Sequence, residues 1–118
     1  MENKTATWQE RFGLTSCPAA GIDPAIPPAA LGVAVIFTPA TAAAAEKVFL
    51  VIESRASGLR SQCVRRLQTP KLPPLASLQV AFQAEALPDA SAEAVHAACR
   101  QQLILSAELR RELRPAMR

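Results

Sequence analysis

The sequence predicts a small mixed α+β domain in which strand, helix, strand and helix follow a disordered N-terminal arm. Three observations lead to this fold class. Residues 31–37 form a short apolar run rich in β-branched side chains, residues 77–86 alternate between apolar and polar side chains, and residues 91–113 repeat apolar side chains at helical spacing. Helices dominate this arrangement. The alternatives are a mostly α-helical chain and a partly disordered one.

The first 30 residues predict a flexible Pro-rich arm. Residues 1–28 contain four prolines and two glycines and show little periodic apolarity, so they offer few side chains to a core. Trp8 and Phe12 are four residues apart, a spacing that suits a short helical turn used for local packing or for docking. Residues 31–114 then form one small domain, and residues 115–118 form a tail.

A buried strand over 31–37 is followed by a predicted helix over 39–68. Thr38-Pro39 supplies the N-cap and the first position of that helix. Residues 48–52 are ambiguous, because five consecutive large apolar side chains also suit a strand. Gly58 disfavours a helix interior by about 1 kcal/mol relative to Ala, so two shorter elements are the alternative.

Prolines at positions 70, 73 and 74 predict a rigid, extended connector. The residues that follow, 77–86, alternate in the manner of a half-buried strand. The apolar face of this strand carries Leu78, Val80, Phe82 and Ala84.

The clearest element is a helix over 91–113. Asp89 or Ser91 suits its N-cap, and Pro115 stops it. One face carries Val95, Cys99, Leu103, Ser106, Leu109 and Leu113.

The predicted strands over 31–37 and 77–86 are joined by the predicted helix over 39–68. Because a helix that joins two strands of one sheet normally leaves them parallel, we expect a parallel pair with a right-handed crossover. Two strands make a poor sheet, so a third is expected from elsewhere, such as a second copy.

The composition argues against catalysis. The chain has one histidine, no tyrosine, two aspartates and four glycines, and it carries neither a glycine-rich phosphate loop nor a nucleophile motif. His96 and Cys99 are three residues apart on the last helix, a spacing that metal ligands use, but two ligands make no site. We therefore expect a protein that is not an enzyme and that uses no cofactor and no metal.

Three cysteines without a Cys-x-x-Cys pair indicate small buried side chains in a reducing compartment. One bridge between Cys63 and Cys99 is the alternative.

The longest apolar stretch, residues 29–37, is far shorter than the ~20 residues that span a membrane. Residues 42–44 have the small side chains of a signal-cleavage site, but the acidic and Pro-broken segment before them disfavours secretion. We expect an intracellular, cytoplasmic protein.

The chain is Ala-rich and mildly basic, with ten arginines, three lysines and a formal net charge of +3. One arginine cluster comprises Arg60, Arg65 and Arg66, and a second follows Arg100 along the last helix. Solvated helix faces explain both clusters, and phosphate contact is the alternative. Aromatic side chains that stack on bases are scarce, which disfavours recognition of a single strand.

The last helix shows more apolar surface than a peripheral helix needs. Ile104 and Leu105 lie off its main apolar face, and Arg110 projects toward that face, where it snorkels or meets a carboxylate on a partner. We therefore predict a small protein-interaction module, an accessory or adaptor subunit, that binds a protein partner or a second copy through Ile104, Leu105, Arg110 and Arg114. The alternatives are a weak nucleic-acid-binding protein that uses its arginine clusters and a largely disordered product of a young reading frame.

Overall fold

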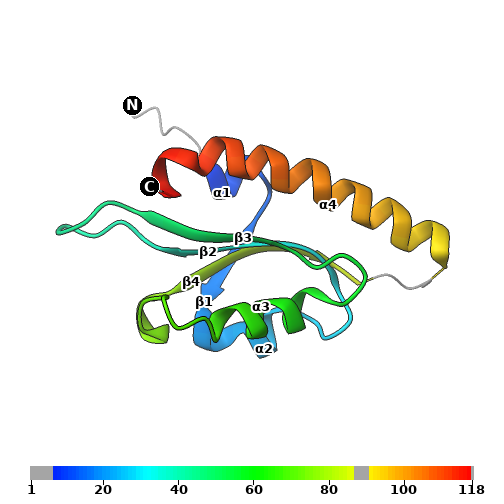
Figure 1. Ribbon diagram of the computed structural model, residues 1–118, viewed down its shortest axis with the longest axis horizontal. Helices are drawn as coiled ribbons and strands as arrows, with labels where there is room; N and C mark the ends of the chain where they lie inside the picture. The colour runs from blue at the N-terminus through cyan, green and yellow to red at the C-terminus, as the bar shows by residue number, and fades with distance from the viewer. Residues whose placement is uncertain (1–6, 87–90, 118) are drawn as a thin grey trace, which may run out of the picture.

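The computed structural model describes residues 7–86 and 91–117 of the 118-residue chain. Four antiparallel strands form one sheet, and helices cover both of its faces (Figure 1). In chain order the elements are α1 (Trp8–Arg11), β1 (Thr15–Pro18), η1 (Ala19–Gly21), α2 (Ile22–Ala25), β2 (Leu31–Thr38), β3 (Lys47–Glu53), α3 (Leu59–Leu67), η2 (Leu75–Ser77), β4 (Gln79–Glu85), α4 (Ala92–Leu113) and η3 (Arg114–Met117), where η marks a 3₁₀ helix. The α+β class predicted from the sequence is confirmed.

The strands lie in the order β1-β4-β2-β3, and every neighbouring pair is antiparallel. The segment with α2 joins β1 to β2, but β4 lies between those strands. In the same way α3 joins β3 to β4, and β2 lies between them. The expected parallel pair is therefore wrong: β2 and β4 are neighbours but run antiparallel, because β3 reverses the chain direction between them. The additional strands, β1 and β3, come from the same chain and not from a second copy.

The helix predicted over 39–68 is also wrong. The structure has a loop over 39–46, then β3, a tight turn and the short helix α3. Val48 and Val51 face α4, whereas Ile52 faces the α3 side, with a register shift in the β2–β3 pairing at this point. Because both faces of β3 are covered, its apolar run is continuous and imitates helical spacing. Gly58, at φ 92, separates the strand from α3.

The segment expected to be a flexible arm contributes to the fold. Strand β1 pairs with β4, and Ile22 and Ile26 are 3% and 0% exposed in the core below the sheet. The prolines of this segment keep its helices short, but they do not prevent apolar side chains between them from packing. Residues 1–6 lie outside the part of the chain that the structure describes.

Two apolar clusters form the core, one on each face of the sheet. Between the sheet and α2 and α3 lie Ala19, Ile22, Ile26, Ala34, Ile36, Ile52, Leu59, Cys63, Leu78, Val80 and Phe82. Between the sheet and α4 lie Val33, Val35, Phe37, Val48, Val51, Ala81, Leu109 and Leu113. The apolar face predicted for residues 77–86, with Leu78, Val80 and Phe82, lies in the first cluster, whereas the opposite face of β4, expected to be exposed, buries Ala81 in the second cluster.

The last predicted helix is confirmed as α4. The Ser91 hydroxyl accepts a hydrogen bond from the Ala94 backbone N–H at 3.2 Å and so caps the helix, whereas Asp89 lies outside the described residues. The buried face of α4 carries Gln102, Ser106, Leu109 and Leu113. Leu103, expected in the core, is 53% exposed because it lies about 100° around the helix from Gln102.

The three cysteines are free, and a bridge between Cys63 and Cys99 does not form. Cys63 is a buried residue of α3 and Cys99 belongs to α4, and these two helices lie on opposite faces of the sheet (Figure 1). Among residues 7–86 and 91–117, no helix has the length and apolarity needed to cross a bilayer.

Candidate interaction surface

Helix α4 is anchored to the sheet through its C-terminal half. Its buried residues all lie from Gln102 onward, and none of residues 92–101 is buried. The N-terminal half runs out past the end of the sheet (Figure 1). Its sequence explains this difference, because Ala94, Ala97 and Ala98 have little apolar surface to bury against the strands.

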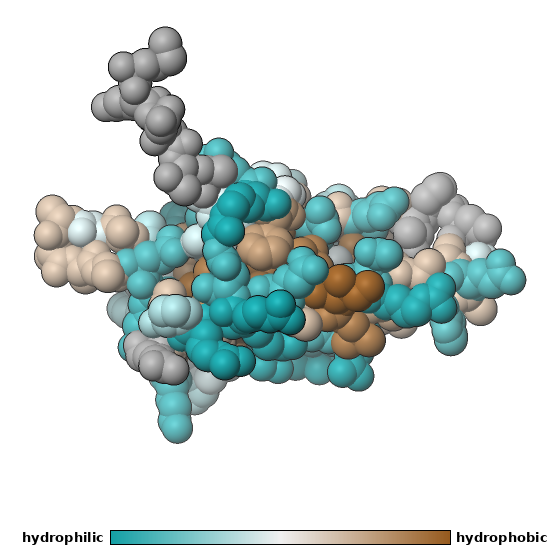
Figure 2. Space-filling view, turned by 90° about the horizontal axis from the view of Figure 1, so that it is seen from above, coloured by the Kyte–Doolittle hydropathy of each residue, from teal (hydrophilic) through white to brown (hydrophobic). Residues whose placement is uncertain are grey.

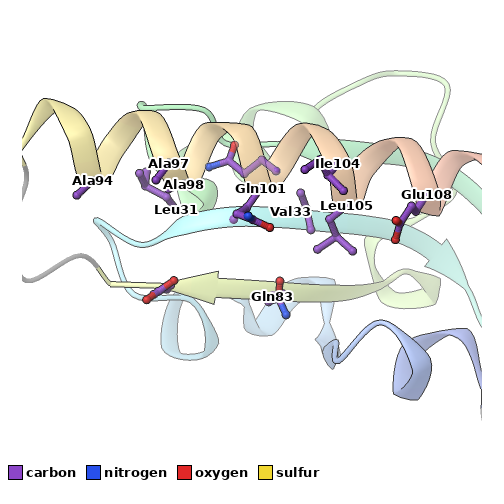
Figure 3. Close-up of a pocket in the computed structure, with 13 residues that line it drawn as sticks. Leu31, Val33, Gln83, Ala94, Ala97, Ala98, Gln101, Ile104, Leu105 and Glu108 are labelled. Atoms are coloured by element: carbon purple, nitrogen blue, oxygen red, sulfur yellow. The ribbon is translucent and has the colours of Figure 1, made fainter.

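A groove of about 520 Å³ lies between residues 94–108 of α4 and the adjoining ends of β2 and β4 (Figure 3). Helix α4 lines one side with Ala94, Ala97, Ala98, Gln101, Gln102, Ile104, Leu105 and Glu108. The sheet lines the other side with Leu31, Gly32, Val33, Gln83 and Glu85. A Cβ atom at Gly32 would lie 1.8 Å from the Gln83 carbonyl oxygen, so the close approach of β2 and β4 on this side requires glycine.

Apolar side chains predominate in the lining of the groove, and its charged residues are acidic. Glu85 and Glu108 are the ionisable residues among those that line it, and no lysine or arginine joins them. The remaining polar groups are glutamine amides. This arrangement suits an occupant that is apolar at its centre and positively charged at its ends.

The structure places only part of the sequence-predicted surface at this groove. Ile104, on its rim, is 55% exposed, and Leu105 lines it while packing partly against the core. Figure 2 shows an apolar patch over this part of α4, where Leu103 is also exposed. Arg114 is exposed in η3 at the end of α4 and does not line the groove.

Arg110 finds its carboxylate within the chain. Its guanidinium donates to Glu53 Oε1 at 2.9 Å and to the Val51 carbonyl oxygen at 3.1 Å. Both acceptors belong to the edge strand β3, so Arg110 ties α4 to that edge. Burial raises the pKa of Glu53, but the hydrogen bonds from Ser106 and Arg110 and the charges of Arg110 and Arg55 outweigh it and lower the pKa below its ordinary value.

The predicted arginine clusters are divided between different roles. Arg60 donates from Nε to the Ile26 carbonyl oxygen at 2.8 Å and from a terminal nitrogen to the Asp23 carbonyl oxygen, so it holds α2 against α3. Arg66 instead lines a second, smaller pocket together with Arg55 and Arg110. The sequence analysis did not bring these three arginines together, because they come from a loop and two helices that only the fold assembles.

Within the described part of the chain, the cysteines are the candidate nucleophiles, and His96 and Cys99 are the candidate pair of metal ligands. Burial raises the pKa of the Cys63 thiol to about 12, with a smaller contribution from nearby Cys17, so Cys63 stays protonated at neutral pH. His96 and Cys99 are joined by no third ligand there, since residues 7–86 and 91–117 hold no group of three metal-ligating side chains.

Comparison of the chain with protein-family models, with curated proteins and with solved structures found no match. The surface therefore has to be understood from its own geometry. One feature of the sequence points to the groove. Ala94, Ala97, Ala98 and Gln101 follow the spacing of one helix flank, and the small size of the three alanines leaves room beside α4.

Proposed function

We propose that this protein is a non-enzymatic interaction module, an accessory or adaptor subunit, that receives an amphipathic helix of a protein partner in the groove beside α4. The observation that carries the proposal is the groove itself, a volume of about 520 Å³ bordered by small apolar side chains with exposed Ile104 on its rim. Apolar grooves of this kind commonly receive a helix through anchors spaced by three or four residues.

The dimensions of the groove fit a short helix. Its wall on α4 extends from Ala94 to Glu108, which is about 21 Å at 1.5 Å per residue. A partner helix of about 14 residues covers that length. Strands β2 and β4 are both interior to the sheet, so they offer less for a partner strand to pair with than an edge does.

A partner helix fits better than a second copy of α4. In each copy the face of α4 beside the groove adjoins the copy's own sheet. That face is therefore already turned toward its own sheet and is not presented to the groove of a second copy. The acidic residues Glu85 and Glu108 further favour an occupant with basic residues at its ends.

Fluorescence anisotropy with two designed peptides tests the proposal. The first probe is a labelled helical peptide of about 14 residues with a Leu/Ala face and arginine at both ends, and the second carries glutamate in place of arginine. We expect the basic peptide to bind and the acidic peptide to bind at least tenfold more weakly, because only the basic ends complement Glu85 and Glu108.

Two matched variants place the binding site. Ala97→Trp fills the groove and should weaken binding of the basic peptide more than tenfold, whereas Ala107→Trp, on an exposed part of α4 that does not line the groove, should leave it unchanged. Both variants should retain the melting temperature of the parent chain, because both positions are exposed. Equal binding of the two peptides, equal loss in the two variants, no binding of the basic peptide, or a dimer in sedimentation that Ala97→Trp disrupts would overturn the proposal.

A further inference from the structure

A notch of about 300 Å³ lies at the edge strand β3, on the other flank of α4 from the groove. Its lining residues are Val51, Ile52, Glu53, Arg55, Gln62, Arg66 and Arg110. The three arginines come from the loop after β3, from α3 and from α4, and α3 and α4 cover opposite faces of the sheet (Figure 1). The fold therefore gathers positive charge from three separate segments around one edge.

The positive charge of the notch exceeds what the chain itself neutralises. Three arginines against the single carboxylate of Glu53 leave a formal excess of two positive charges. Glu53 pairs with Arg110, and that ion pair and the bond to Val51 use only part of the Arg110 donor set. Within residues 7–86 and 91–117, the guanidinium groups of Arg55 and Arg66 make no hydrogen bond.

The backbone at Arg55 provides a second, independent observation. Arg55 has φ 54, a left-handed conformation that an arginine adopts only under constraint. The constraint is the buried side chain of Gln102, which accepts from the Arg55 N–H at 2.6 Å and donates to the Arg55 carbonyl oxygen at 3.3 Å. Backbone strain that the surrounding structure maintains is enriched at binding sites, and here it sets the direction in which the Arg55 side chain leaves the turn.

We propose that this notch is an anion site that binds the phosphate group of a phosphate monoester. The planar guanidinium fork forms paired, charge-assisted hydrogen bonds with phosphate oxygens, which the point charge of a lysine does not reproduce. A phosphate monoester carries nearly two negative charges at neutral pH, which matches the formal excess of the notch. Gln62, on α3, adds a side-chain amide to the lining.

Thermal unfolding and titration calorimetry test the site with inorganic phosphate and phenyl phosphate, each compared with sodium chloride and sodium acetate at the same ionic strength. A ligand that binds only the folded chain stabilises it by RT ln(1 + L/Kd), where L is the free ligand concentration, so the melting temperature rises as the ligand concentration increases above Kd. We expect both phosphates to stabilise the chain and chloride and acetate to have a smaller effect. Stabilisation by chloride or acetate equal to that by phosphate would overturn the proposal.

Three variants make the test specific. Arg66→Gln should weaken phosphate binding by about tenfold, the loss expected for a charge-assisted contact. Its neighbour Arg65→Gln removes the same charge from an exposed position outside the notch and should leave phosphate affinity unchanged. Glu53→Gln keeps an acceptor for Ser106 but removes the internal carboxylate, so it should strengthen phosphate binding.

Two outcomes of the measurements on these variants would overturn the proposal. Equal weakening in Arg65→Gln and Arg66→Gln would mean that phosphate responds to the overall charge of α3 and not to the notch. Binding of a ten-nucleotide RNA far more tightly than phenyl phosphate, with both variants weakening it equally, would instead favour a nucleic-acid surface. The groove and the notch can be tested independently, because they have no lining residue in common. The Ala97→Trp variant, which fills the groove, should therefore leave phosphate binding unchanged.

Discussion

The side-chain amide of Gln102 bonds to both backbone polar groups of Arg55, accepting from its N–H at 2.6 Å and donating to its carbonyl oxygen at 3.3 Å. Gln102 is 4% exposed on the sheet-facing side of α4, and Arg55 lies in the turn that follows β3. One buried side chain therefore connects the last helix to the turn between β3 and α3. It also satisfies polar groups that the left-handed backbone at Arg55 removes from regular pairing.

Replacing Gln102 with leucine should destabilise the protein. Gln102→Leu leaves the Arg55 N–H without its partner, whereas the Arg55 carbonyl oxygen keeps the hydrogen bond from the Ser54 hydroxyl, so we expect the free energy of unfolding to fall by about 1–3 kcal/mol. Chemical denaturation measures this change. The control is Gln101→Leu, an exposed neighbour on α4, which should change stability by less than about 0.5 kcal/mol. Similar losses in the two variants would contradict the role of the Gln102 bonds.

The ion pair at the β3 edge predicts a pH dependence of stability. Although burial opposes ionisation, hydrogen bonds from Ser106 and Arg110 hold the pKa of Glu53 below its ordinary value of 4.5. A depressed pKa stabilises the fold fully above the unfolded pKa, and the contribution is lost as pH falls through the folded value.

Glu53→Gln should therefore lose less stability than the parent chain between about pH 5 and about pH 3. Urea unfolding at several pH values in this window measures the two slopes. Glu108→Gln, at an exposed carboxylate outside the ion pair, is the matched control and should follow the parent profile. Parallel pH profiles for the parent and Glu53→Gln would show that the pair contributes nothing to acid stability.

The N-terminal segment should be needed for stability. Ile26 is 0% exposed in the core below the sheet, so Ile26→Ala should lower the free energy of unfolding by about 2–4 kcal/mol. Ile26→Val removes one methyl group and should cost about 0.5–1.5 kcal/mol. Thermal and denaturant unfolding measure both. An unchanged melting temperature in Ile26→Ala would mean that residues 1–30 behave as the flexible arm that their prolines first suggested.

Two leucines on α4 should respond differently to the same truncation. Leu109 is 0% exposed between α4 and the sheet, and Leu109→Ala should cost about 2–4 kcal/mol of stability. Leu103 is 53% exposed, and Leu103→Ala should cost less than about 1 kcal/mol. Differential scanning calorimetry of the pair checks both values. A loss at Leu103 as large as that at Leu109 would place Leu103 in a buried interface.

Local patterns predicted the elements that are regular over their whole length. The alternation of residues 77–86 identified β4 from the face that carries its large apolar side chains, and the apolar spacing of residues 91–113 identified α4. The run at residues 48–52 was misassigned to a helix, since a strand covered on both faces loses the alternation that identifies it. Leu103 was assigned to the wrong face of α4, because a shift of one residue along a helix turns the side chain by about 100°, and the buried position is Gln102.

The sequence by itself determined the fold class, the strands over 31–37 and 77–86 and the last helix, all of which depend on periodicity within one segment. Only the tertiary structure decided the antiparallel order of the strands, the pairing of Arg110 with Glu53 and the gathering of Arg55, Arg66 and Arg110. These features join residues that are tens of positions apart. Such contacts depend on the free energy of the whole packed arrangement, which local propensity does not encode.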